Sequence, residues 1–403
     1  MHPRYQGGGI PRREFLRRGG VALTALGASP LLFSACGGSD KKAVTGTGGS
    51  PPKPIEGTGK LGGRIDFLSW EGYDIPDPMK DWKKTNDVTL KATYIATHDD
   101  IQAKLIAAKG KGGYDLTTYY QGYKPLYREL GILSPLDSER VPNMKNLYPF
   151  FQGDQGTFWV EPDGTRTGVP WDYGAIGITW DDKALPGGVP SWYDLLDPKF
   201  KGKVGAVDDP AGNLALVCHI LKLKPDEIKK DSEDLTKVKD LLSKMWAQTT
   251  GISASYGDMT QKLTSGDVVV CWMGWAAMNT FAAGKGVKTV KTLLPKEGSY
   301  GFTDGWAIPP GSDNVSTIYA WMDQTLDPTY NARIAEYLVG ATVCPDGVDK
   351  LNAETKALYD YSNIDALFEA APLYNNPPSS SDEFVTFAEW QDIYTELKAG
   401  AGA

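Results

Sequence analysis

The sequence predicts an α/β protein built of two lobes with a cleft between them. Three observations predict this class. Strand and helix patterns alternate along the chain, two long extended stretches interrupt the alternation, and about 340 of the 403 residues are available for a folded body. Alternating strands and helices favour mostly parallel sheets flanked by helices. A body of this length is enough for two domains of ordinary size.

The first part of the body repeats a strand and a helix. GRIDFLSW at 63–70, VTLKATYI at 88–95 and YDLTTYY at 114–120 have the composition and alternation of strands. PDPMKDWKKT at 76–85 starts with prolines and acids, as helices do. DDIQAKLIAAKGKGG at 99–113 reads as a helix that ends in glycines. Because a strand follows these glycines, they indicate a C-terminal helix turn and not a phosphate-binding loop.

The second part contains two long extended stretches, GVPWDYGAIGITWDD at 168–182 and SYGFTDGWAIPPGS at 299–312. We expect them to cross from one lobe to the other, and the lobes to rotate near Val169–Trp171 and Gly305–Ile308. Further elements are expected as a helix, turn and strand at 191–209, helices at 210–221, 234–248 and 274–284, and a buried strand at 266–272.

The chain divides into four predicted parts. They are a signal segment at 1–35, a flexible tether at 36–60, a first lobe at 61–169 plus 307–353, and a second lobe at 170–306 plus 354–403. The tether consists of Gly, Ser, Thr, Lys and Pro with almost no large apolar residue, so it has nothing with which to form a core.

The N-terminus has the features of an export signal for a lipoprotein. Arg12 and Arg13 form a twin-arginine pair, followed by an apolar run from Val21 to Phe33. That run is about 13 residues, which is too short to span a bilayer but suits a signal peptide. The sequence FSAC before and including Cys36 resembles a bacterial lipobox. Lipid on Cys36 would anchor the mature chain outside the cytoplasmic membrane, in the periplasm or at the cell surface.

Charge and composition exclude several classes of function. Residues 1–35 hold five Arg and one Glu, so 37 basic and 49 acidic residues remain of the 42 and 50, a net charge of −12. A chain this acidic repels nucleic acid. Only His98 and His219 remain in the body, far apart, which argues against a histidine-built metal site. No cofactor motif is present, and we expect no cofactor, no nucleic-acid partner and a monomer.

Three cysteines, Cys218, Cys271 and Cys344, follow Cys36. They allow at most one disulfide. Cys271 lies in the apolar run DVVVCWMG, which favours a buried free thiol, so a bridge is slightly disfavoured. The state of Cys218 and Cys344 stays open at this stage.

Aromatic and acidic residues follow the predicted strands, where ligands bind in open α/β sheets. The candidate ligand-binding residues are Trp70, Glu71, Tyr73, Tyr120, Tyr123, Trp171, Asp209, Trp272, Phe302 and Asp304, with Asp172, Asp208 and Trp275 beside them. Carboxylates compensate the desolvation of a ligand ammonium, and each ring adds a cation–π attraction of about 0.5–2 kcal/mol. For any single residue the alternative is structural: a tryptophan in the core, or Asp208 or Asp209 capping the next helix.

Several motifs resemble, in the same order, those of the spermidine/putrescine-type periplasmic substrate-binding proteins of bacterial ABC transporters. They are LSWEGYD, YDLTTYY, VPWDYGAIGITWDD, DVVVCWMGWAA and LLPKEGSYGFTDGWAIP, and the resemblance covers roughly 63–345. It implies a two-lobe periplasmic-binding-protein fold, a small ligand, no catalysis, and a permease and an ATPase as partners.

The resemblance also implies roles for single residues. Trp70 and Tyr73 match an aromatic clamp, Asp209 and Asp304 match amine-binding aspartates, and Trp272 matches a stacking tryptophan. The chain departs from the pattern at four positions: Gly72 and Gly212 stand where acids are expected, Phe302 stands in place of a tryptophan, and the tyrosine expected near Tyr123 is shifted by about one residue.

The function expected from the sequence is capture of a small cationic solute, a polyamine such as putrescine or spermidine, for an ABC importer. A first alternative keeps the binding role but changes the ligand to a neutral or zwitterionic organic solute. A second alternative, a secreted hydrolase, is disfavoured because histidines are scarce and no activated nucleophile is apparent.

Overall fold

The computed structural model describes residues 54, 59–95, 98–109, 111–153, 158–161 and 163–400. The predicted signal segment, the predicted lipidation site Cys36 and most of the predicted tether lie outside these residues. Within the described part of the chain, no helix has the length and apolar character needed to cross a membrane.

The strands of the described residues form one sheet with the order β2-β1-β3-β9-β4-β7-β5-β6, and β8 pairs with β4. Their bounds are β1 (Gly63–Ser69), β2 (Val88–Tyr94), β3 (Leu116–Tyr120), β4 (Val169–Asp181), β5 (Val204–Val207), β6 (Thr249–Ser253), β7 (Val270–Trp275), β8 (Val290–Leu293) and β9 (Gly301–Ala307).

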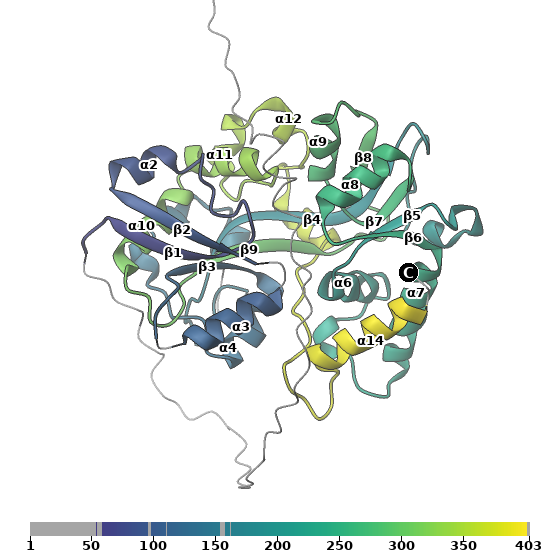
Figure 1. Ribbon diagram of the computed structural model, residues 1–403, viewed down its shortest axis with the longest axis horizontal. Helices are drawn as coiled ribbons and strands as arrows, with labels where there is room; N and C mark the ends of the chain where they lie inside the picture. Colours follow the sequence, from purple (N-terminus) through teal and green to yellow (C-terminus); the bar gives the residue numbers. More distant parts are fainter. Residues whose placement is uncertain are drawn as a thin grey trace, which may run out of the picture. The chain divides into compact units, whose positions relative to one another are not determined.

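Two parallel groups of strands make up the ends of this sheet. β1 pairs in parallel with β2 and β3 at one end, and β5 pairs in parallel with β6 and β7 at the other. The long strands β4 and β9 join the groups and run antiparallel to their neighbours (Figure 1). They are the two extended stretches of the sequence, so the predicted two-lobe α/β class with crossing strands is confirmed. The residue limits of each lobe stay a prediction.

Helices cover both faces of the sheet. In Figure 1, α3, α4, α6 and α14 lie on one side, and α2, α8, α9 and α11 lie on the other. The α-helices are α2 (Lys80–Thr85), α3 (His98–Ala108), α4 (Lys124–Glu129), α5 (Pro149–Gln152), α6 (Pro210–Ile220), α7 (Glu233–Gln248), α8 (Tyr256–Ser265), α9 (Ala277–Ala283), α10 (Val315–Thr325), α11 (Pro328–Leu338), α12 (Ala353–Lys356), α13 (Ile364–Ala370) and α14 (Phe387–Gly400).

Single-turn 3₁₀ helices connect several of these elements. They are η1 (Gln121–Tyr123), η2 (Ser138–Arg140), η3 (Pro142–Asn146), η4 (Tyr193–Leu196), η5 (Pro198–Phe200), η6 (Pro225–Glu227) and η7 (Pro345–Lys350). Residues 191–200 thus form two short turns where the sequence predicts one helix. Asp197 is extended, with φ −61° and ψ 127°. The following Pro198 disfavours the helical conformation at Asp197, which explains the break.

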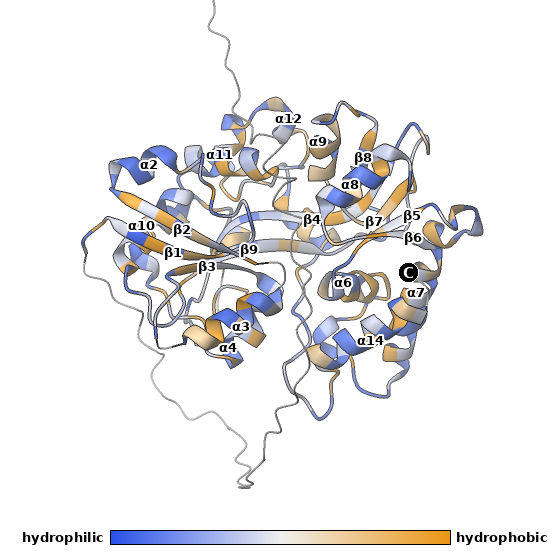
Figure 2. Ribbon diagram, in the orientation of Figure 1, coloured by the Kyte–Doolittle hydropathy of each residue, from blue (hydrophilic) through white to orange (hydrophobic). Residues whose placement is uncertain are grey.

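Each parallel group has its own hydrophobic core. One core gathers around β5, β7, α6 and α7 and includes Trp246 and Trp272. The other gathers around β1, the start of β4 and α10, and includes Trp171, Trp306 and Trp321. Figure 2 shows the hydrophobic residues concentrated in the strands, whereas the outer helix α2 is hydrophilic. The C-terminal region contributes to both cores, through α13 to the second and through α14 to the first.

Two local predictions are confirmed, and two elements were not predicted. Lys111 N donates to Ala108 O at 2.9 Å, and Gly112 has φ +70°, so the glycines after α3 do form a turn. Cys218, Cys271 and Cys344 are all buried free thiols. The sequence does not anticipate β6 and α8; α8 begins at the cap Ser255 and ends at Gly266 in the left-handed conformation.

Candidate functional site

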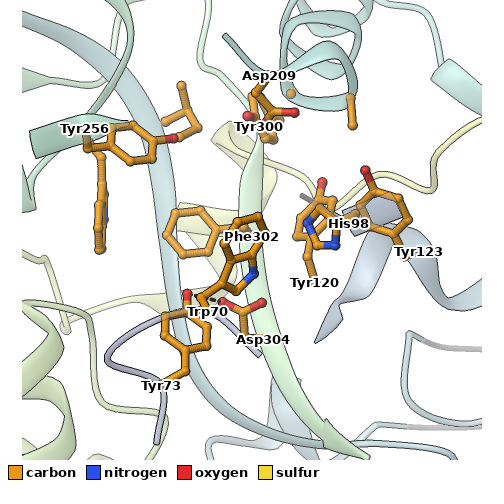
Figure 3. Close-up of a pocket in the computed structure, with 14 residues that line it drawn as sticks. Trp70, Tyr73, His98, Tyr120, Tyr123, Asp209, Tyr256, Tyr300, Phe302 and Asp304 are labelled. Carbon is orange, nitrogen blue, oxygen red and sulfur yellow. Dashed lines mark hydrogen bonds between the residues drawn. The ribbon is translucent and has the colours of Figure 1, made fainter. Parts of the chain in front are cut away.

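A cavity of about 160 Å³ opens where the strands of both lobes end. Aromatic rings and two carboxylates dominate its wall (Figure 3). The lining residues are Trp70, Tyr73, His98, Tyr120, Tyr123, Ile176, Asp209, Ala211, Gly212, Tyr256, Trp275, Tyr300, Phe302 and Asp304. Most follow or end the strands β1, β3, β5 and β7, whereas Phe302 and Asp304 lie within the crossing strand β9. The cavity therefore occupies the edge that the strand-end argument indicates.

The turn after β1 brings Trp70 and Tyr73 into the cavity wall. Tyr73 N donates to Trp70 O at 3.2 Å, which closes the turn. Gly72 lies inside it with φ +93°, a backbone conformation that L side chains rarely adopt. An acid at this position would be strained, so the departure at Gly72 has a structural cause in addition to the missing charge.

Strand alternation places the residues of β4 and β9. In the antiparallel register, Asp172 lies opposite Asp304 and Gly174 lies opposite Phe302. Paired residues share a face, so Asp172, Gly174, Phe302 and Asp304 lie on the side of the cavity. Gly174 leaves the space that the Phe302 ring occupies, because a Cβ there would stand 2.5 Å from the ring.

Asp304 is buried and lines the cavity. Its Oδ2 accepts a hydrogen bond from Tyr73 Oη at 2.9 Å. Its backbone N–H donates to Asp172 Oδ1 at 3.2 Å. Burial raises the pKa of Asp304 to about 6, although the hydrogen bond from Tyr73 opposes the shift. The carboxylate is therefore destabilised in its charged form and suited to a cationic partner.

Asp209 lies at the opposite end of the cavity from Asp304, with the rings of Trp70 and Phe302 between them in Figure 3. It is the N-cap residue of α6, and its carboxylate lies beside the first backbone N–H groups of that helix. Burial raises its pKa, and the N–H groups of Gly212 and Ala211 oppose that rise. A side chain at Gly212 is excluded, because its Cβ would lie 2.3 Å from Tyr300 Oη and 2.5 Å from Asp209 Oδ2.

The neighbouring Asp208 is occupied elsewhere. It accepts a hydrogen bond from Tyr394 at 2.8 Å and forms an ion pair with Lys398 at 2.9 Å. Both partners are on α14. By contrast, among the described residues no Lys or Arg forms an ion pair with Asp172, Asp209 or Asp304. The formal charge facing the cavity is therefore negative.

Rings form two walls between the carboxylates. His98 stacks on Tyr123 with centroids 3.9 Å apart, and Trp70 meets His98 edge-on at 5.3 Å. Burial lowers the pKa of His98 to about 3, so it is neutral. Opposite, Trp275 meets the rings of Tyr256 at 5.5 Å and Phe302 at 5.8 Å, both edge-on.

Seven of the ten candidate residues line the cavity: Trp70, Tyr73, Tyr120, Tyr123, Asp209, Phe302 and Asp304. Glu71 does not, because it is exposed on the outside of its turn. Trp171 is fully buried in a core, stacked on Trp306 at 4.5 Å, with its Nε1 donating to Thr118 Oγ1. It meets Tyr73 edge-on at 5.2 Å and lies on the same face of β9 as Asp304, one strand pair further from the cavity. The register shift between Pro170 and Asp172 interrupts the alternation of faces at this point of β4.

Trp272 is also in a core instead of the cavity. It packs edge-on against Trp246 at 5.1 Å and donates to Thr249 Oγ1 at 3.1 Å. Trp275, paired with Ile176, occupies the cavity wall from the same strand. A register shift lies between the two rings, and Met273 between them has φ +62°, so simple alternation does not relate them.

Seven lining residues are missing from the sequence-based set: His98, Ile176, Ala211, Gly212, Tyr256, Trp275 and Tyr300. Trp275 follows a predicted strand, so the strand-end argument could have placed it in the cavity. His98 and Tyr256 lie at the starts of helices, and the strand-end argument does not apply to such positions. Among the described residues no group of three His, Cys, Asp or Glu side chains could hold a metal ion.

Comparison with known proteins agrees with this architecture. Residues 79–359 match the model of the family described as bacterial extracellular solute-binding protein. The putrescine-binding periplasmic protein SpuD of Pseudomonas aeruginosa is 26% identical over 288 residues, which are 68% of this chain and 76% of that protein. The putrescine-binding periplasmic protein PotF of Escherichia coli is 26% identical over 308 residues, 72% of this chain and 81% of that protein.

A solved structure shares the fold. The spermidine/putrescine ABC transporter substrate-binding protein PotD from Streptococcus pneumoniae superposes with a TM-score of 0.68 at 18% identity, covering 84% of this chain and 98% of that one. These relatives are binding proteins of transporters and not enzymes. Because the family model matches well over half of its length, the chain belongs to the bacterial extracellular solute-binding proteins.

Proposed function

We propose that this protein is the substrate-binding lipoprotein of an ABC importer and captures a small diamine of the putrescine type in its interlobe cavity. One observation carries the proposal: Asp209 and Asp304 stand at opposite ends of an aromatic cavity, and neither has a cationic partner among the described residues. The names of the relatives SpuD and PotF, both putrescine-binding, support the same ligand class.

Two ligand ammonium groups complete the site electrostatically. A carboxylate removed from water and left unpaired costs several kcal/mol, and a matching cation offsets that cost. The rings of Trp70 and Phe302, between the carboxylates in Figure 3, provide faces for the methylene chain and cation–π attraction for the ammonium groups.

The volume of the cavity favours a short amine. Its 160 Å³ resembles the engineered apolar cavity of about 150 Å³ that holds benzene. Putrescine has as many non-hydrogen atoms as benzene, whereas spermidine is longer and carries a third ammonium. We therefore expect putrescine to bind more tightly than spermidine.

Zwitterionic and neutral solutes fit less well. No Lys or Arg of the described residues lines the cavity, so the carboxylate of a zwitterion would find no cationic partner among them. A neutral solute would leave Asp209 and Asp304 buried without counter-ions. Both classes serve as outcomes of the experiment below.

The remaining parts of the proposal concern the path of the ligand. The lobes close around the ligand by rotation about β4 and β9 near Val169–Trp171 and Gly305–Ile308. The monomer then delivers the ligand to a membrane permease with its ATPase. Lipid on Cys36 holds the protein at the membrane, and Cys36→Ala is expected to release it into the soluble fraction.

Calorimetric titration of the mature protein with putrescine and with spermidine tests the ligand class. We expect saturable heat with both and the tighter affinity for putrescine. A thermal-shift panel of amines, amino acids and sugars serves as the comparison. Stabilisation by a sugar or an amino acid, with none by either polyamine, would overturn the proposal.

A further inference from the structure

A second carboxylate lies beside Asp304, on the neighbouring strand. Asp172 and Asp304 are opposite one another in the register of β4 and β9, and the register shifts between Pro170 and Asp172. Asp172 is 3% exposed and Asp304 is 6% exposed. Like charges that face each other across strands destabilise a sheet, and burial increases that cost. The pair is therefore unfavourable with both carboxylates ionised.

The surroundings of the pair contain no compensating cation. The titratable groups that face it are tyrosines: Tyr73 from the turn after β1, Tyr120 from β3 and Tyr359 from the segment before α13. Burial raises the pKa of all three, so they are neutral. Within the part of the chain that the structure describes, no Lys, Arg or His acts on the charge of either carboxylate.

The hydrogen bonds distinguish the two members. Asp304 Oδ2 accepts from Tyr73 Oη at 2.9 Å, which favours the ionised form of Asp304. Asp172 Oδ1 accepts the backbone N–H of Asp304 at 3.2 Å, which leaves Asp172 Oδ2 as the position for a proton. Burial and the adjacent Asp304 raise the pKa of Asp172 well above its usual value, in line with that assignment.

We propose that Asp172 holds a proton when the site is empty, and that an ammonium group arriving at Asp304 releases about one proton from this pair to solvent. The O–H bond of Asp172 breaks, its electrons remain on the carboxylate, and the proton passes to the buffer. The ammonium then interacts with two negative charges, Asp304 in the cavity wall and Asp172 on the neighbouring strand.

This inference rests on the proposed function and deepens it. It makes Asp172 a determinant of ligand charge, although Asp172 does not line the cavity. A neutral ligand has no charge with which to expel the proton. The site thus gains negative charge only when a cation enters, and it avoids two uncompensated carboxylates when empty.

Calorimetry in two buffers measures the proton directly. The full chain is titrated with putrescine at one pH, near neutrality, in phosphate and in Tris, whose ionisation enthalpies differ. The difference in observed heat gives the protons released per ligand. We expect about one proton for the unaltered protein. Asp172→Asn is expected to release close to none, because the amide keeps an acceptor for Asp304 N–H but has no proton to give.

A matched variant controls for charge removal on the same strand. Asp181 lies at the far end of β4 and accepts a hydrogen bond from Lys183 N. Asp181→Asn should release as many protons as the unaltered protein. The affinity of the unaltered protein should fall by up to tenfold per pH unit on acidification, and the fall should begin at a lower pH in Asp172→Asn.

The outcomes separate the two proposals. Putrescine heat that is independent of the buffer overturns the proton release and leaves the proposed function standing. Equal proton release by Asp172→Asn and the unaltered protein overturns the role of Asp172. The absence of any heat with putrescine and spermidine overturns the proposed function itself. Should Asp172→Asn fail to fold, the proton count of the unaltered protein still decides.

Discussion

Replacing Asp304 by asparagine removes one charge from the cavity and keeps the shape of the side chain. Asp304 is 6% exposed and already accepts the Tyr73 hydroxyl at 2.9 Å. A ligand ammonium held there loses its counter-ion at a buried position. Breaking a buried, hydrogen-bonded charge pair costs about 2–5 kcal/mol, and 1.4 kcal/mol is tenfold in affinity. We therefore expect Asp304→Asn to weaken putrescine binding roughly 100-fold.

The same substitution should stabilise the ligand-free protein at neutral pH. Folding raises the pKa of Asp304 from 3.8 to about 6. The folded state therefore holds this proton more firmly than the unfolded chain does. The contribution of Asp304 to stability is favourable at low pH and is lost as the pH rises from 3.8 to about 6, at a cost on the order of 3 kcal/mol above that range. Asparagine removes this cost.

Calorimetry and thermal unfolding of the same variants test both effects. Asp304→Asn is compared with the unaltered protein and with Asp181→Asn, which removes a carboxylate far from the cavity. We expect weaker binding together with a higher Tm for Asp304→Asn, and neither change for Asp181→Asn. A folded Asp304→Asn protein that binds putrescine within threefold of the unaltered affinity would refute the assignment of Asp304 to the ligand.

Three further predictions follow from the geometry. Trp272→Ala should lower the free energy of unfolding by about 3–5 kcal/mol with little change in the affinity of the folded protein, whereas Trp275→Ala should weaken putrescine binding. Urea unfolding measures the first effect and calorimetry the second. The reverse pattern would contradict the placement of these rings. Gly72→Asp and Gly72→Ala should destabilise equally, by about 1–2 kcal/mol, because the strain at positive φ and not the charge decides; tighter spermidine binding by Gly72→Asp would show otherwise. Gly212→Ala should abolish putrescine binding in a calorimetric titration, since its Cβ would collide with Tyr300 and Asp209, and retained affinity would mean that this wall yields.

The class of the fold is predictable from the sequence because its signals are local. β4 and β9 are recognisable as long extended stretches of sequence. The buried face of α7 is recognisable from the helical spacing of Val238, Leu241, Leu242 and Met245. The cavity edge is predictable too, since ligands collect where parallel strands end. Asp209 and the rings of Trp70 and Tyr73 follow from that rule, whereas Asp304 lies within the crossing strand β9.

The face to which each residue points is not predictable in the same way. Trp171 and Asp172 are neighbours in β4, and the register shift between Pro170 and Asp172 interrupts the alternation of faces there, so Trp171 packs on Trp306 in the core. Register depends on pairing between strands far apart in the sequence, and a shift of one residue exchanges the two faces. A second irregularity, at Met273 with φ +62°, separates Trp272 in the core from Trp275 in the cavity wall.

Helix residues at the cavity depend on tertiary placement. His98 and Tyr256 belong to α3 and α8, whose sequences show caps and amphipathic patterns but not their position over the strand ends. The departures at Gly72 and Gly212 have structural causes that the sequence alone does not reveal, namely a positive φ at one and the nearby Tyr300 hydroxyl at the other.

The central claim is that the cavity selects its ligand by charge. Calorimetric titration with putrescine and with 1,4-butanediol tests it most directly, because the two molecules match in length and differ in their terminal groups. We predict that putrescine binds and that the diol binds at least about 100-fold more weakly, as expected when two buried carboxylates lose their cationic partners. Equal affinity for the two would contradict the claim.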